Sequence, residues 1–136
     1  MIKVIVGSKG SGKTARLVDD LNEQANNETT NVVCIESGRR LDQHVKYQIR
    51  LVDIKEYPVK GYDQLLGFIA GIRAKDYDVS HVYIDSITKV AADNDLTHLE
   101  IFLEKLDTFT KKDDFNVMII LSADPDILPK SVRRFC

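Results

Sequence analysis

A glycine-rich octapeptide near the start of the chain constrains the fold more than any other feature of the sequence. It matches the pattern G-x-x-x-x-G-K-[ST] at every position and consists of Gly7, Ser8, Lys9, Gly10, Ser11, Gly12, Lys13 and Thr14. The apolar run Ile2–Val6 leads into it, and the amphipathic segment Thr14–Ala25 leads out of it. A strand that enters a helix through such a turn is the first half of a βαβ unit. We therefore expect this octapeptide, called the glycine-rich loop below, to open an α/β domain.

The same alternation of short β-branched runs and longer segments of helical period continues along the chain. Further strands are expected at Val32–Ile35, His81–Ile84 and Val117–Leu121, with a weaker candidate at Arg50–Ile54. Helices are expected at Tyr62–Ala74 and at Leu96–Phe109 behind an Asp95 cap, and Gly38–Gln48 is a candidate for a further short helix. Most of these strands lack polar alternation, which indicates burial on both faces. The predicted architecture is α/β, a three-layer αβα sandwich around a mostly parallel sheet, in a single domain over residues 1–136.

Composition excludes several classes of protein. The chain is 43% hydrophobic and 29% charged with a net charge of −2, so no global cationic field attracts nucleic acid. No apolar stretch approaches the roughly 20 residues of a membrane span, and the first apolar run is too short for a secretory signal. Neither the two cysteines nor the three histidines have the spacing of a metal site. We expect a cytoplasmic protein without a structural zinc ion.

The glycine-rich loop has the composition of a phosphate-binding site. Glycines let consecutive backbone N–H groups turn inward around phosphate oxygens, and the following helix adds partial positive charge. Lys13 would reach the β- and γ-phosphates, and Thr14 would ligate Mg²⁺. The sequence therefore predicts that a nucleoside triphosphate and Mg²⁺ bind here, whereas the alternative is a glycine turn that merely starts a helix.

A carboxylate at the end of a neighbouring strand is the expected second ligand of that metal. The run His81–Ile84 ends at Asp85, which would hold Mg²⁺ through a water molecule. Asp53 follows a weaker strand and Asp78 lies in a polar loop, so both are weaker candidates. The alternative for Asp85 is a plain cap or turn residue.

The glycine-rich loop followed by "VYIDS" at 82–86 resembles the Walker A and Walker B pair of P-loop NTPases. The segment "NVVCIES" at 31–37 is similar to the strand of RecA-like ATPases that carries the catalytic glutamate, which implies that Glu36 polarises the attacking water. The segment "VMIILSADPDILPKSVRRF" at 117–135 is similar to the sensor strand of the additional-strand division and to the arginine-bearing segment of AAA+ proteins. This resemblance implies that Ser122 lies between the glycine-rich loop and Asp85, near the γ-phosphate.

Three functions fit these features. The first is a RecA-like ATPase that couples hydrolysis to a protein partner or an assembly. The second is a small-molecule or nucleotide kinase, because "GSKGSGKT" also fits the form common in those enzymes, although no segment resembles their arginine-bearing lid. The third is a nucleotide-binding switch or adaptor that does not hydrolyse. ATP is expected rather than GTP, because no N-K-x-D guanine-reading signature is present.

Two arginine pairs, at 39–40 and 133–134, are candidate sources of further positive charge. A finger supplied in trans would require a homo-oligomer. The same pairs could instead contact nucleic-acid phosphates or lie in solvent as basic turns.

Overall fold

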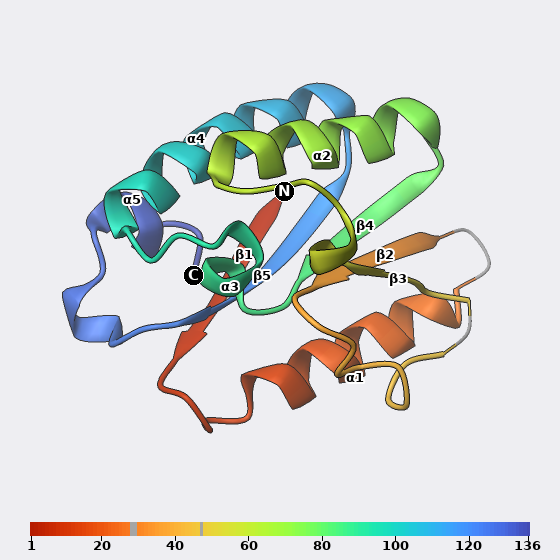
Figure 1. The fold of residues 1–136 in the computed structure, drawn as a ribbon, viewed down its shortest axis with the longest axis horizontal. Coiled ribbons are helices and arrows are strands. Elements are labelled where there is room, and N and C mark those ends of the chain that lie inside the picture. The colour runs from red at the N-terminus through yellow and green to blue at the C-terminus, as the bar shows by residue number, and fades with distance from the viewer. Residues whose placement is uncertain (28–29, 47) are drawn as a thin grey trace.

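Five parallel strands form the centre of the structure, a computed structural model that describes residues 1–27, 30–46 and 48–136 (Figure 1). The strands are β1 (Ile2–Gly7), β2 (Asn31–Glu36), β3 (Arg50–Asp53), β4 (Val79–Ile84) and β5 (Asn116–Ser122). The α-helices over the described residues are α1 (Lys13–Ala25), α2 (Tyr62–Lys75), α3 (Ile87–Ala91), α4 (Leu96–Asp113) and α5 (Lys130–Arg133). Two short 3-10 helices are η1 (Ile54–Glu56) and η2 (Pro125–Ile127). The α/β class and the parallel sheet are therefore confirmed.

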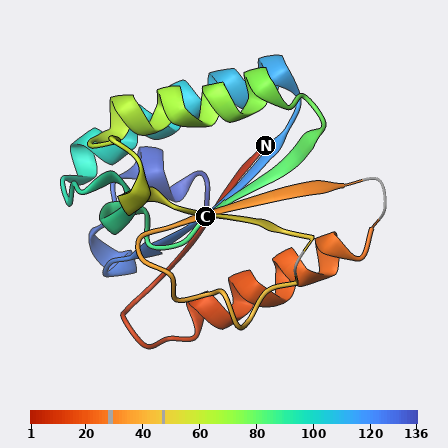
Figure 2. The same ribbon diagram turned by 45° about the vertical axis from the view of Figure 1, so that its right-hand side comes forward.

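Helices cover both faces of this sheet, as Figures 1 and 2 show, with α1 on one face and α2 and α4 on the other. Side chains of each strand alternate between two cores. In β2, Val33 and Ile35 belong to the core under α2 and α4, whereas Val32 and Cys34 belong to the core under α1. The arrangement is compatible with a three-layer sandwich.

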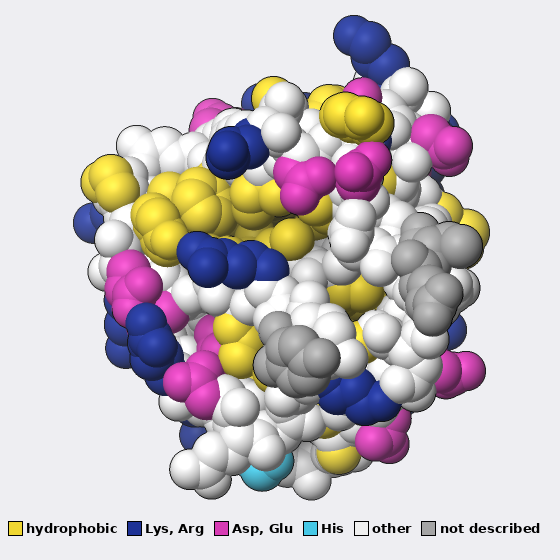
Figure 3. All heavy atoms as spheres, turned by 90° about the vertical axis from the view of Figure 1, so that its right-hand side faces the viewer, with side chains coloured by type: hydrophobic (Ala, Val, Ile, Leu, Met, Phe, Trp, Pro, Cys, Tyr) yellow, Lys and Arg dark blue, Asp and Glu magenta, His cyan; other side chains and the backbone are white. Residues whose placement is uncertain are grey.

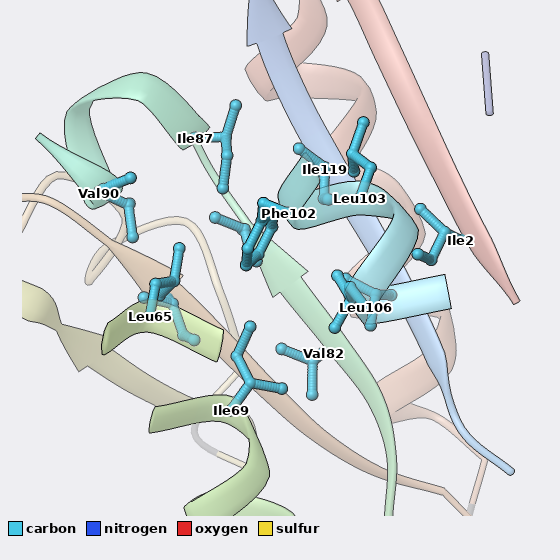
Figure 4. Close-up of a cluster of buried hydrophobic side chains, with 14 of the residues drawn as sticks. Ile2, Leu65, Ile69, Val82, Ile87, Val90, Phe102, Leu103, Leu106 and Ile119 are labelled. Carbon is cyan, nitrogen blue, oxygen red and sulfur yellow. The ribbon is translucent and has the colours of Figure 1, made fainter. Parts of the chain in front are cut away.

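The larger core joins α2 and α4 to the middle of the sheet (Figure 4). Leu65 and Ile69 of α2 and Leu103 of α4 are fully buried in it together with Val82 and other strand residues. Burying each such side chain stabilises the fold by about 1.5–3 kcal/mol. This core holds the central strands rigidly, so the loops that follow them start from defined positions.

Asp95 begins α4 as predicted, because its Oδ1 accepts hydrogen bonds from the backbone N–H groups of Thr97, at 2.8 Å, and His98, at 3.3 Å. The prediction of a helix within Gly38–Gln48 is wrong for the residues that the structure describes there, which form bends and turns; position 47 lies outside them. The carboxylates of Glu36 in β2 and Asp53 in β3 accept hydrogen bonds from backbone N–H groups of this segment. Gly38 has a φ of +90°. Both features oppose a helix.

The strand order is β1-β5-β4-β2-β3, so β5 is inserted between β1 and β4. Because every strand is parallel, all five carboxyl ends lie at one edge of the sheet. Along this edge the order of the terminal or following residues is Gly7, Ser122, Asp85, Glu36 and Asp53. The topology therefore brings the predicted site residues to one edge, although they are distant in the sequence.

Basic and acidic side chains are interspersed on the face shown in Figure 3, around a gathering of hydrophobic side chains in its upper part. No single-sign field covers this face, so the view offers no continuous basic surface for a nucleic-acid backbone. Within the described residues, no helix combines the length and the apolar character needed to cross a bilayer.

Candidate functional site

The glycine-rich loop turns tightly between β1 and α1. Gly10 and Gly12 both have a φ of +84°, a left-handed conformation that side chains other than glycine rarely adopt. A Cβ atom on Gly7 would lie 2.6 Å from Ser11 Oγ, so a side chain at this position would require the Ser11 hydroxyl to move. The Ser11 N–H donates to Ser8 O at 3.2 Å and closes the turn. Two of the predicted glycines, Gly10 and Gly12, are therefore required by the shape of the loop.

Lys13 is the first residue of α1, and its side chain folds back over the glycine-rich loop. Its Nζ donates to Ser8 O at 2.7 Å and lies 3.5 Å from Ser11 Oγ. Lys13 is only 8% exposed. The ammonium charge and the α1 amino terminus thus meet at the mouth of the loop, an arrangement that favours an anion.

Thr14 and Asp85 meet across 71 residues of sequence. The Thr14 hydroxyl donates to Asp85 Oδ1 at 3.4 Å, and the Asp85 N–H extends the pairing of β4 with β2 by donating to Ile35 O at 3.0 Å. Asp85 is 1% exposed. A hydroxyl and a carboxylate are hard oxygen donors, which Mg²⁺ prefers, and Mg²⁺ commonly takes few ligands from the protein. The donor set therefore fits the predicted metal.

Arg40 provides the positive charge beside this carboxylate. Its Nη2 lies 3.3 Å from Asp85 Oδ2, and the arginine side chain is 53% exposed. The neighbouring Arg39 turns away and pairs with Glu56 at 2.6 Å. The sequence pointed to both arginines as sources of charge, but it did not indicate that Arg40 alone of this pair reaches Asp85 of the same chain.

Glu36 ends β2 and is 1% exposed. Its Oε1 accepts hydrogen bonds from the backbone N–H groups of Arg40, at 2.9 Å, and Leu41, at 3.2 Å. Its Oε2 is buried and has no hydrogen-bond partner among the described residues. Burial raises the pKa of Glu36 above its usual value, and the two N–H bonds oppose that rise. One oxygen thus holds the 38–41 turn, and the other is buried without a hydrogen-bond partner among the described residues.

A hollow of about 420 Å³ opens beside the glycine-rich loop and Arg40. Its basic lining residues are Lys9, Lys13, Arg40 and Lys89, and its hydroxyl-bearing lining residues are Thr14, Ser86 and Ser122. None of the described residues that line it is acidic. Four cations around one hollow make it complementary to a polyanion.

Ser122 reaches this hollow because β5 runs beside β1, with Ser122 and Gly7 as paired residues. Ser86 has a φ of +58°, an uncommon conformation for a residue other than glycine, which places local strain next to Asp85. Ser86 and Lys89 were not among the site residues predicted from the sequence. Only their nearness to Asp85 in the sequence could have indicated them, and that nearness does not predict the direction that the chain takes after β4.

The remaining candidates lie elsewhere. Asp53 Oδ1 accepts from the N–H groups of Gly38, at 2.8 Å, and Lys55, at 3.0 Å, so it organises a turn instead of facing the hollow. Arg133 donates to Asp126 O at 3.0 Å, and the Arg134 guanidinium lies 4.3 Å from the centroid of the Phe135 ring. Among residues 1–27, 30–46 and 48–136, no cluster of three or more His, Cys, Asp or Glu side chains could hold a metal ion.

Comparison of the sequence with models of known protein families gave no match, and neither did comparison with curated proteins. The function must therefore be argued from the geometry of the site.

Proposed function

We propose that the protein binds Mg²⁺-ATP at the glycine-rich loop and hydrolyses the bond between its β- and γ-phosphates, which yields ADP and inorganic phosphate. The observation that carries the proposal is a cationic hollow lined by Lys13 and Thr14, with the Thr14 hydroxyl 3.4 Å from the Asp85 carboxylate. The resemblance to RecA-like P-loop ATPases supports the proposal. That resemblance implies a sensor strand between β1 and β4, and β5 lies between these two strands.

Each residue has a role that follows from its chemistry. The N–H groups of the glycine-rich loop and the Lys13 ammonium would bind phosphate oxygens. Thr14 and Asp85 would hold Mg²⁺, which would offset the negative charge of the β- and γ-phosphates. Ser122 would donate a hydrogen bond to the terminal phosphate from the end of β5.

Glu36 would orient the attacking water through its free Oε2. Its raised pKa makes the carboxylate a stronger base than an ordinary surface glutamate. Because Oε1 is held by two backbone N–H groups, the side chain has a defined orientation for this task.

A nucleotide-binding switch that does not hydrolyse is the second candidate. The observation that favours it is the same pair of hydrogen bonds at Glu36, since they give this residue a structural role that needs no catalysis. A small-molecule or nucleotide kinase would bind the same nucleotide but transfer the phosphate to an acceptor.

The experiment that tests the proposal compares the wild-type protein with Lys13→Ala and with Lys3→Ala, an exposed lysine on β1 that serves as the control. Binding of Mg²⁺-ATP is measured by calorimetry, and phosphate release is followed in steady state. Loss of a charged donor to phosphate should weaken binding by about tenfold to a hundredfold in Lys13→Ala. Lys3→Ala should behave as the wild type.

Three results would contradict the proposal in different ways. Equal affinity in the wild type and Lys13→Ala would remove the glycine-rich loop from nucleotide binding. Binding without phosphate release would favour the switch. Transfer of the γ-phosphate to an added acceptor instead of water would favour the kinase.

A further inference from the structure

Arg40 connects the two acidic strand ends of the site. Its backbone N–H donates to Glu36 at the end of β2, and its guanidinium pairs with Asp85 at the end of β4. The same side chain lines the cationic hollow together with Lys13 and Ser122. Arg40 is thus anchored at its backbone and exposed at its charged end.

We propose that Arg40 is a γ-phosphate ligand that acts within its own chain, and that its pairing with Asp85 is its resting position. This inference rests on the proposed function, because it requires a triphosphate in the hollow. Under this inference, the positive charge at the γ-phosphate comes from Arg40 of the same chain instead of an arginine of a neighbouring subunit.

Arg40 would change its partner because a divalent cation competes with its guanidinium for the Asp85 carboxylate. Asp85 Oδ1 faces Thr14, and Asp85 Oδ2 faces Arg40. A divalent cation held by Thr14 and Asp85 would neutralise the carboxylate and repel the guanidinium. A guanidinium has donors only and matches phosphate oxygens through two parallel hydrogen bonds, so the γ-phosphate is the better partner under those conditions.

The backbone geometry makes this change a local one. Glu36 Oε1 holds the N–H groups of Arg40 and Leu41, so the turn need not move when the guanidinium changes partner. Only side-chain torsions of Arg40 are required, and its 53% exposed side chain leaves room for them. Arg40 would therefore distinguish a triphosphate from a diphosphate.

The test measures binding of the β,γ-imido analogue of ATP and of ADP, each with Mg²⁺, by calorimetry. The variants are Arg40→Ala and Arg40→Lys, and the matched control is Arg39→Ala, because Arg39 pairs with Glu56 instead of Asp85. Loss of one charge-assisted contact should weaken the triphosphate analogue by about tenfold to a hundredfold in Arg40→Ala. The affinity for ADP should change by less than about threefold, and Arg39→Ala should match the wild type for both ligands.

Arg40→Lys keeps the charge and guards against misfolding of the alanine variant. It should recover part of the triphosphate affinity, because an ammonium binds phosphate as a point charge without the paired geometry. Equal losses for the triphosphate analogue and ADP in both Arg40 variants would show a structural role and overturn the inference, as would unchanged affinity for the triphosphate analogue.

Failure of the proposed function would look different. In that case the wild type would not bind the triphosphate analogue, or Lys13→Ala would bind it as tightly as the wild type. If the analogue binds in a Lys13-dependent manner, the Arg40 variants alone decide the inference. A turnover rate per subunit that stays constant across protein concentration would also support action within one chain.

Discussion

The ends of β4 and β2 carry two carboxylates that are equally buried but have different kinds of hydrogen-bond partner. Asp85 and Glu36 are each 1% exposed. Asp85 is paired with two side chains, the Thr14 hydroxyl and the Arg40 guanidinium. Glu36 is paired through one oxygen with two backbone N–H groups and has a second oxygen without a partner.

Because of this difference, Asp85 can exchange its hydrogen-bond partners, whereas Glu36 is held by the backbone of the 38–41 turn. Side chains can rotate away from Asp85 when a cation arrives, whereas the N–H groups that hold Glu36 belong to the turn itself. We therefore expect Asp85 to control binding of the metal and Glu36 to control turnover. Substitutions at the two positions should separate these effects.

The largest effect is expected for turnover in Glu36→Gln. Glutamine keeps an oxygen for the N–H groups of the 38–41 turn, but its amide cannot accept a proton from water. Phosphate release should fall by about a hundredfold to ten-thousandfold, while the affinity for the imido analogue should stay within about threefold of the wild type. Steady-state release and calorimetry check the two halves of this prediction. Unchanged turnover would mean that Glu36 takes no part in hydrolysis and only stabilises the 38–41 turn.

A smaller effect on binding is expected for Asp85→Asn. Asparagine retains the size of the side chain but loses the charge that a divalent cation needs. The gain in nucleotide affinity that Mg²⁺ provides should fall by about tenfold, and the affinity in EDTA should change little. Titrations with and without Mg²⁺ measure this difference directly. An undiminished Mg²⁺ effect would place the metal ligand elsewhere.

Local sequence patterns were sufficient for much of the fold and for part of the site. The strand Ile2–Val6, the glycine-rich loop and α1 form one contiguous unit, and the apolar run before Asp85 identified β4, so short-range periodicity found both. Asp85 was predicted as a partner of Thr14 because a bound triphosphate needs its metal held by a carboxylate at the end of a neighbouring strand. These predictions depend on residues adjacent in sequence and on the chemistry that a bound triphosphate requires.

The β2 side of the site could not be predicted in the same way. Arg39 and Arg40 are adjacent and chemically identical, and only the turn decides which of them reaches Asp85. That turn is shaped by contacts of Glu36 and Asp53 with backbone N–H groups, which no periodicity records. The same contacts explain why the predicted helix within Gly38–Gln48 was wrong.

The smallest effect concerns stability as a function of pH, and it sharpens the contrast between the two carboxylates. Burial raises the pKa of Glu36 in the folded protein above its unfolded value. Its protonation therefore stabilises the folded state below the unfolded pKa of about 4.3, and this contribution is lost as the pH rises through the higher folded pKa. Glu36→Gln cannot ionise, so its free energy of unfolding relative to the wild type should increase as the pH rises from about 4.5 to about 8. Urea unfolding of both proteins across this range measures the difference, in which other titrating groups largely cancel. A difference that stays constant with pH would mean that the two backbone N–H bonds fully compensate the burial of the Glu36 charge.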